Sequence, residues 1–273
     1  MTARLYDDDP LTPEERTQYE DDLIAFCDRE LDLLGDIRGL DVLYAGGASP
    51  LWIEGLSQRL GDDGVLTVIE VNAGLVEHVR QALRDADLHA PVDLVVGSAF
   101  EMPFRGGVFN LAYSTGLFHE LDVRERDAKD ALEELARVVR SGGKVATGDW
   151  VDTGEKYPPV DLEWERMEGE ATCEIRGAEL YGICPPEQLV ALHERVLDGV
   201  KWSISPPYPL RHLGKIMLSE PDEPAEYTAL PAAARSRLLT LRNALKERTQ
   251  REGYSRAATL YVEGRVEENP PAG

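Results

Sequence analysis

Short runs dominated by apolar and β-branched residues alternate, in the first half of the chain, with segments whose apolar residues recur at helical spacing. Such runs are typical of strands buried on both faces, and the spaced segments of amphipathic helices. The predicted strands cover residues 41–45, 65–71, 92–96, 109–114 and 144–150. The predicted helices between them cover residues 51–60, 77–86 and 127–140. This alternation predicts an α/β fold, with a parallel sheet covered by helices on both faces.

A longer amphipathic segment precedes the first strand. Residues 12–15, Thr-Pro-Glu-Glu, form a capping box with proline at the first helical position. Apolar residues then recur at helical spacing, which predicts a helix from about Pro13 to Leu34 that ends near Gly35. We assign this helix to an N-terminal unit, residues 1–36, that packs beside the first strand or covers the site.

The bend after the first strand is the first candidate binding element. Asp41–Ala45 stops at Gly46 and Gly47, and Ser49 and Pro50 then suit the N-cap and the first position of the next helix. A ligand can approach the backbone at such a bend. In an α/β sheet this turn meets nucleotide-like ligands at the carboxyl ends of the strands.

A carboxylate near the end of the second strand adds to this signal. Glu70 precedes Val71 and lies about two dozen residues after the glycines, the spacing at which nucleotide sites place an acidic residue. That residue accepts hydrogen bonds from two ribose hydroxyls. Together, the glycine bend and Glu70 predict a ribose-containing ligand.

Charge narrows the class of partner. Acidic residues number 51 against 29 basic ones, which gives a net charge of −22. A partner held mainly by its phosphate charge is therefore disfavoured, so we expect no nucleic acid and no membrane as partners. The scattered acidic residues predict a solvated surface.

Cysteine content and the first residues bear on the compartment. The three cysteines, Cys27, Cys173 and Cys184, cannot form a disulfide framework, and their spacing fails as a zinc site. We expect ordinary thiols and no metal. The first residues contain no apolar stretch that could act as a signal peptide, and no segment reaches the apolar length of a bilayer span. The expected location is cytoplasmic.

The central part of the chain resembles a known family. Residues 131–150 look like the helix, Gly-Gly turn and fifth strand of class I S-adenosylmethionine-dependent methyltransferases, and the segments 96–104 and 109–121 stand at the family's intervals. The resemblance covers about residues 40–150. It implies a Rossmann-like sheet of seven strands, mostly parallel, with an antiparallel last strand and S-adenosylmethionine across the strand ends. A methyltransferase acting on a small-molecule acceptor is therefore expected.

The resemblance also implies roles for single residues. Gly46 and Gly47 would approach the methionine end of the cofactor, Glu70 would hold the ribose, and Ala99 with Phe100 would border the adenine. The full candidate set for cofactor binding is Tyr44, Gly46, Gly47, Glu70, Val71, Ser98, Ala99, Phe100 and Ser114.

The glycine motif departs from the family's pattern. Tyr44 stands where the family usually has an acidic residue, and Ala48 and Pro50 replace its second and third glycines. Ser98 replaces the acidic residue of the adenine loop, although its hydroxyl can still hydrogen-bond an exocyclic amine. These changes suggest the alternative of a non-catalytic cofactor-binding or scaffold protein with a degenerate fold. A nicotinamide-dependent oxidoreductase is disfavoured because the loop lacks Gly-x-Gly-x-x-Gly.

Methyl transfer places few demands on catalytic side chains. Its acceleration can come from holding the acceptor in line with the methyl group, and a base is needed only if the acceptor must lose a proton. His119 is the first candidate because it follows the fourth strand, with Glu120 or Asp149 as helpers. The alternative is that His119 only caps or packs the following helix.

The remainder of the chain is expected to complete the sheet. We assign residues 37–152 to the cofactor-binding core and residues 153–273 to an acceptor-side insertion and the last strands. Residues 151–181 are polar and irregular, with a possible helix around Trp164 and Met167. Further helices are predicted at residues 185–197 and 230–251, a sixth strand at 200–204, and a last strand, antiparallel if the family layout holds, at 257–263.

Overall fold

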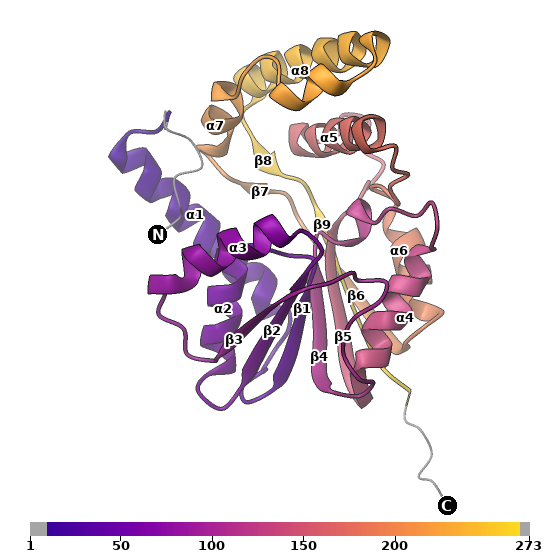
Figure 1. Ribbon diagram of the computed structural model, residues 1–273. Helices are drawn as coiled ribbons and strands as arrows, with labels where there is room; N and C mark the ends of the chain where they lie inside the picture. Colours follow the sequence, from indigo (N-terminus) through magenta and orange to yellow (C-terminus); the bar gives the residue numbers. More distant parts are fainter. Residues whose placement is uncertain (1–9, 268–273) are drawn as a thin grey trace, which may run out of the picture.

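The computed structural model describes residues 10–267, and a seven-stranded sheet with the order β3-β2-β1-β4-β5-β9-β6 forms its centre. Strands β1 to β5 run parallel, and β9 is antiparallel to both β5 and β6. The Rossmann-like sheet with an antiparallel last strand is thus confirmed (Figure 1). The strands are β1 (Asp41–Ala45), β2 (Val65–Glu70), β3 (Val92–Val96), β4 (Phe109–Thr115), β5 (Val139–Trp150), β6 (Asp198–Ser205) and β9 (Thr259–Arg265).

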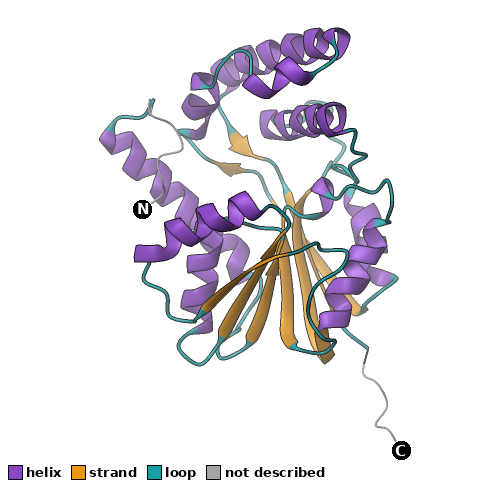
Figure 2. Ribbon diagram, viewed as in Figure 1, coloured by secondary structure: helices purple, strands orange, loops and turns teal. Residues whose placement is uncertain are grey.

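Helices cover both faces of this sheet, as Figure 2 shows. In β1, Val42 and Tyr44 belong to the core on one face, and Leu43 and Ala45 to the core on the other, so all four side chains are buried. This is why β1 is a continuous apolar run. The first face carries α1 (Pro13–Asp32), α2 (Pro50–Leu60) and α3 (Ala73–Ala82), and the second carries α4 (Ala128–Val138) and α6 (Pro186–Glu194).

Helix starts depend on local caps. The capping box at Thr12 is present, because Thr12 Oγ1 accepts from the backbone N–H of Glu15 and the Glu15 side chain accepts from that of Thr12. The predicted start of α3 is wrong, since the helix begins at Ala73 and not at Glu77. Asn72 Oδ1 accepts from two backbone N–H groups of the first turn and so caps the helix earlier.

The end of α4 also differs from the prediction. The helix ends at Val138, and residues 139–143, which include the predicted Gly-Gly turn, belong to β5. Gly142 has φ +72°, and the pairing of β5 with β4 shifts register between Phe109 and Leu111. The glycines therefore produce an irregularity within a strand, not a turn before it.

A third group of helices lies at the end of the sheet where β1 and β4 finish, in the upper part of Figure 1. It consists of α5 (Val160–Arg176), α7 (Leu213–Ser219) and α8 (Ala232–Glu252), which share a separate apolar cluster that includes Trp164 and Met167. The possible helix predicted around Trp164 and Met167 is thus present as α5, within a segment otherwise predicted as irregular. A short ribbon of β7 (Tyr208–Pro209) and β8 (Ser255–Arg256) joins this group to the sheet. Within residues 10–267, no helix has the length and apolar character needed to cross a membrane.

Candidate functional site

Two adjoining cavities open where β1, β2 and β4 end, and both have Gly46, Glu70 and Glu120 in their walls. The first cavity has a volume of about 580 Å³ and is bordered by the loop after β3. The second has a volume of about 340 Å³ and lies over the glycine bend. Because Glu70 and Glu120 stand in the walls of both, one elongated ligand can occupy the two cavities together.

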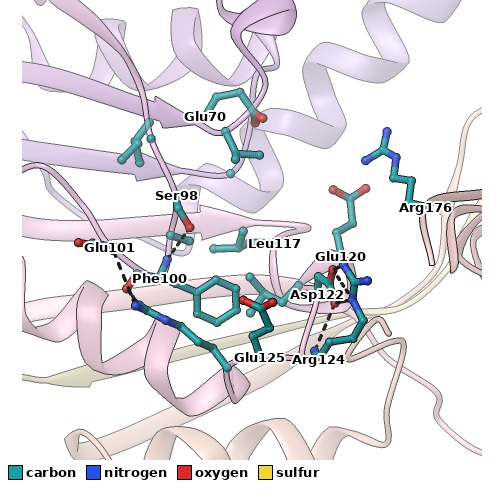
Figure 3. A pocket seen from close by; sticks show the side chains of 17 residues that line it. Glu70, Ser98, Phe100, Glu101, Leu117, Glu120, Asp122, Arg124, Glu125 and Arg176 are labelled. Carbon is teal, nitrogen blue, oxygen red and sulfur yellow. Dashed lines mark hydrogen bonds and ion pairs between the residues drawn. The ribbon is translucent and has the colours of Figure 1, made fainter. Parts of the chain in front are cut away.

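The first cavity combines apolar surface with polar groups (Figure 3). Ser98, Ala99 and Phe100 line it, and Ser98 Oγ accepts from the backbone N–H of Phe100 at 3.1 Å, which fixes the loop. A hydroxyl oxygen can accept a second bond and donate one, so Ser98 keeps capacity for a ligand. Val71 is 71% exposed at the edge of the cavity, an unusual place for a large apolar side chain and a suitable surface for a flat ring.

Glu70 is held with one carboxylate oxygen left over. The side chain is buried, and Oε1 accepts from the backbone N–H of Asn72 at 2.8 Å. Oε2 has no hydrogen-bond partner among residues 10–267. A buried carboxylate with a spare oxygen at the junction of two cavities is a strong acceptor for ligand hydroxyls.

Both glycines of the bend are required by their neighbours. Gly46 has φ +72°, and a Cβ there would lie 2.4 Å from Leu117 Cδ1. A Cβ on Gly47 would lie 2.0 Å from the hydroxyl oxygen of Tyr44. Part of the space over the bend is therefore filled by the protein's own side chains, and a ligand approaches from the cavity side.

Tyr44 brings a polar atom to this bend. Its side chain is fully buried, lines the second cavity and stacks on Tyr113 with ring centroids 5.6 Å apart. Burial raises the pKa of Tyr44 well above its ordinary value, so the phenol stays protonated. Its hydroxyl has no hydrogen-bond partner in the described part of the chain. An unpaired buried hydroxyl is costly, and a polar ligand atom at the bend would satisfy it.

His119 is fixed by the carboxylate of Asp149. Nδ1 of His119 lies 2.7 Å from Asp149 Oδ1, and Asp149 also accepts from the backbone N–H groups of Phe118, His119 and Trp150. The imidazole packs edge-on against Trp150, with centroids 4.9 Å apart. This arrangement places the Nδ1 proton toward Asp149 and leaves Nε2 as the exchangeable nitrogen, 3.9 Å from Glu120 Oε1.

The surroundings of His119 and Glu120 shift the pKa values of both residues. Burial lowers the pKa of His119, but the charge and hydrogen bond of Asp149 more than offset it, so the net shift is upward. Desolvation raises the pKa of Glu120 as well. Glu120 and Asp149 line the second cavity, whereas His119 is only 8% exposed and contacts three residues of its wall, Glu120, Asp149 and Trp150.

Most of the residues predicted to bind the cofactor lie in the walls of the two cavities. Ser114 is the exception, because it is 1% exposed and lies in the wall of neither cavity. Sequence reasoning also missed several residues of the second cavity, and only the apolar face of α1 gave any signal for one of them, Phe26. The missed residues are Phe26, Glu30, Trp52, Trp150, Arg256 and Thr259.

The cysteines lie apart from this chemistry. Cys27 and Cys184 are buried, Cys173 is half-buried, and all three thiols are free. Burial raises the pKa of Cys27 to about 12. Between residues 10 and 267, no group of three or more His, Cys, Asp and Glu side chains is arranged to hold a metal ion. The expectation of a protein without a metal stays a prediction.

The family model and the curated relative that this chain matches are both described as methyltransferases. A family model described as "Methyltransferase domain" matches residues 41–147. The ubiquinone/menaquinone biosynthesis C-methyltransferase UbiE of Idiomarina loihiensis is 32% identical over 116 residues, which is 42% of this chain and 44% of that protein. The chain thus spans less than half the length of this relative.

Solved structures agree on the fold. The YcgJ protein of Bacillus subtilis superimposes with a TM-score of 0.58 at 14% identity, covering 90% of this chain and 100% of that one. A SAM-dependent methyltransferase of Aquifex aeolicus gives a TM-score of 0.50 at 18% identity, covering 73% of this chain and 93% of that one.

Proposed function

We propose that this chain transfers the methyl group of S-adenosylmethionine to a small-molecule acceptor, since residues 41–147 match the family model described as "Methyltransferase domain". The relative in Idiomarina loihiensis is named as acting in quinone biosynthesis, which supports a small molecule as the acceptor class. The surface charge of a chain with net charge −22 favours such an acceptor over a nucleic acid.

The observation that carries the proposal is the position of Glu70 between the two cavities. We place the adenine against Ser98, Ala99 and Phe100 in the first cavity and the ribose hydroxyls at Glu70. The methionine part then extends over the glycine bend into the second cavity. The residues fit this cofactor, because the unpaired Tyr44 hydroxyl in the wall of the second cavity would meet polar groups of its amino-acid end.

When bound, the cofactor would supply an activated methyl group, to which the acceptor bonds in line with the breaking carbon–sulfur bond while S-adenosylhomocysteine leaves. The chain's part is to orient the acceptor and exclude water, with Trp150 in the cavity wall. Where the acceptor must lose a proton, His119 accepts it at Nε2, either directly or through Glu120. Asp149 fixes the tautomer and stabilises the imidazolium that forms.

Binding of the cofactor is the first test of this function. We expect isothermal calorimetry to show binding of S-adenosylmethionine and of S-adenosylhomocysteine, and none of NAD. Labelled methyl groups from S-adenosylmethionine should then appear in small molecules. Absence of binding by both sulfur compounds would refute the proposal and favour the scaffold alternative.

Glu70→Ala should weaken binding of S-adenosylmethionine by about 1.5–3 kcal/mol, because the lost hydrogen bonds are to a charged group. Calorimetry measures this as a dissociation constant raised by about one to two powers of ten. Glu77→Ala is the matched control, since Glu77 lies on α3 with an exposed side chain paired with Arg80. An unchanged dissociation constant for Glu70→Ala would contradict the ribose assignment.

Tyr44→Phe removes only the unpaired hydroxyl. If this hydroxyl binds the cofactor, the dissociation constant of S-adenosylmethionine should rise by the worth of one hydrogen bond, about 0.5–1.5 kcal/mol. The free energy of unfolding of the free protein should not fall, because no partner is lost. Tyr227→Phe is the control, since it removes another buried, unpaired hydroxyl outside both cavities. Equal affinities for wild type and Tyr44→Phe would leave Tyr44 with a packing role.

A further inference from the structure

Arg256 is a cation in the wall of the second cavity that the proposed mechanism does not use. It lies in β8, and its guanidinium carbon is 4.7 Å from the centroid of the Trp150 ring. Stacking on an aromatic face holds the guanidinium plane in one orientation. The residue therefore presents a fixed positive charge beside the place where the acceptor would lie.

One end of this guanidinium is anchored by carboxylates. Nη1 donates to Asp161 Oδ1 at 3.1 Å and to Glu165 Oε1 at 3.4 Å. Asp161 is fully buried and also accepts from Trp150 Nε1, the Tyr254 hydroxyl and the backbone N–H of Ala257. Asp161 thus positions both Arg256 and Trp150 at the cavity wall.

The other edge of the guanidinium has no partner. Nε is buried without a hydrogen bond, and Nη2 makes none with any residue between 10 and 267. Nε–H and Nη2–H are parallel donors, a geometry that matches the two oxygens of a carboxylate. The guanidinium can therefore bind one more anion while it keeps its anchor.

Two carboxylates of the second cavity, those of Glu30 and Asp149, are already engaged. Glu30 accepts from Arg29 through Oε1 and from the Thr259 hydroxyl through Oε2. Asp149 accepts from three backbone N–H groups and from His119. Neither is left to neutralise the free edge of Arg256.

We propose that Arg256 binds a carboxylate group of the methyl acceptor, whose apolar body lies against the aromatic walls of the second cavity. This inference rests on the proposed function. The aromatic walls come from Phe26, Trp52 and Trp150. Glu120 in the same wall would attract the cationic sulfonium of the cofactor, whereas Arg256 would repel it and attract the acceptor's anion. The acceptor is thus a small organic acid.

Three matched probes of nearly equal size test the charge preference: benzoate, benzyl alcohol and benzylamine. Each is titrated by calorimetry or ligand-observed NMR into the full chain, both unloaded and saturated with S-adenosylhomocysteine. We expect benzoate to bind at least about tenfold more tightly than the other two, since hydrogen bonds to a charged pair contribute more than 1.4 kcal/mol. Arg256→Met should remove this preference.

Arg256→Lys is a second variant, which keeps the test informative if Arg256→Met does not fold. Lysine keeps a charge for Asp161 but lacks the paired donors, so we expect the preference for benzoate to fall and the protein to stay folded by circular dichroism. Arg237→Met is the matched control, because Arg237 forms ion pairs with Glu170 and Glu174 away from both cavities. It should leave the preference unchanged.

Several results would overturn the inference. One is equal or tighter binding of benzylamine by the wild type, which would indicate a cationic acceptor. A second is a benzoate preference that survives in both Arg256 variants. A third is a loss of S-adenosylhomocysteine binding in these variants with unchanged binding of methylthioadenosine, which would assign Arg256 to the cofactor's own carboxylate. Failure of the wild type to bind S-adenosylhomocysteine would refute the proposed function instead. Benzoate binding to the unloaded protein would still test whether Arg256 binds a carboxylate.

Discussion

For an acceptor that must lose a proton, replacing His119 by alanine is expected to lower kcat by about 10²–10⁴-fold, the usual contribution of a positioned general base, with the dissociation constant of S-adenosylmethionine unchanged. The reason is the fixed orientation of the ring, whose Nδ1 lies 2.7 Å from Asp149 and whose Nε2 is left to exchange a proton. Formation of S-adenosylhomocysteine in the presence of acceptor measures the turnover.

Two variants separate catalysis from packing. His119→Asn keeps a donor for Asp149 but has no basic nitrogen, so it should be as slow as the alanine variant while unfolding like the wild type at a pH above the folded pKa of His119. His89→Ala is the control, because His89 is exposed and lies in the wall of neither cavity. Full activity in His119→Asn would leave His119 a purely structural residue.

The pH dependence of kcat and of stability follows from the interaction of His119 with Asp149. The base must be neutral, and Asp149 raises the pKa of His119 above its ordinary value of 6.5, so kcat should fall as pH drops through that raised pKa. The contribution of this pair to the free energy of unfolding changes with pH in the opposite direction. The ion pair stabilises the fold fully below pH 6.5, the unfolded value, and this contribution is lost as pH rises through the folded pKa. His119→Asn should remove both dependences.

Asp161→Ala is expected to lower the free energy of unfolding by about 3–5 kcal/mol, because it leaves the Arg256 charge and several donors without their buried partner. Asp161 is 0% exposed and accepts from Trp150, Tyr254, Arg256 and Ala257. Urea denaturation monitored by tryptophan fluorescence gives the value.

Asp122→Ala is the matched control for Asp161. Asp122 also pairs with an arginine, Arg124, but this pair lies at the surface, where an ion pair contributes little to stability. If the two variants unfolded with equal free energies, the Asp161 network would have no special role in stability. Preserved benzoate discrimination in Asp161→Ala would likewise contradict its role in positioning Arg256.

The sheet was predictable from the sequence because its strands are buried on both faces. In β1, both faces are apolar, so the run from Val42 to Ala45 stands out without knowledge of its neighbours. Element ends were harder. The start of α3 depends on the Asn72 side chain, and the end of α4 on pairing between β4 and β5, which no local pattern shows.

The two cavities differ in how far the sequence predicted them. The first is built from consecutive loop residues, such as Ser98 to Phe100, so a family resemblance locates it. The second is assembled from α1, β5 and the segment around Arg256, which are far apart in the chain. The role of its polar groups depends on contacts such as that of Arg256 with Asp161. The spacing of residues in the sequence does not predict such contacts.

The place of β9 in the sheet has a consequence for synthesis of the protein on the ribosome. β9 is nearly the last element of the described chain, yet it lies between β5 and β6 and pairs with both. Until it emerges, the edge of β5 has unpaired backbone groups that can join a strand of another nascent chain. Slow translation of the codons between β5 and β9 would therefore prolong the aggregation-prone stage, although the glycine bend and Glu70 were made long before.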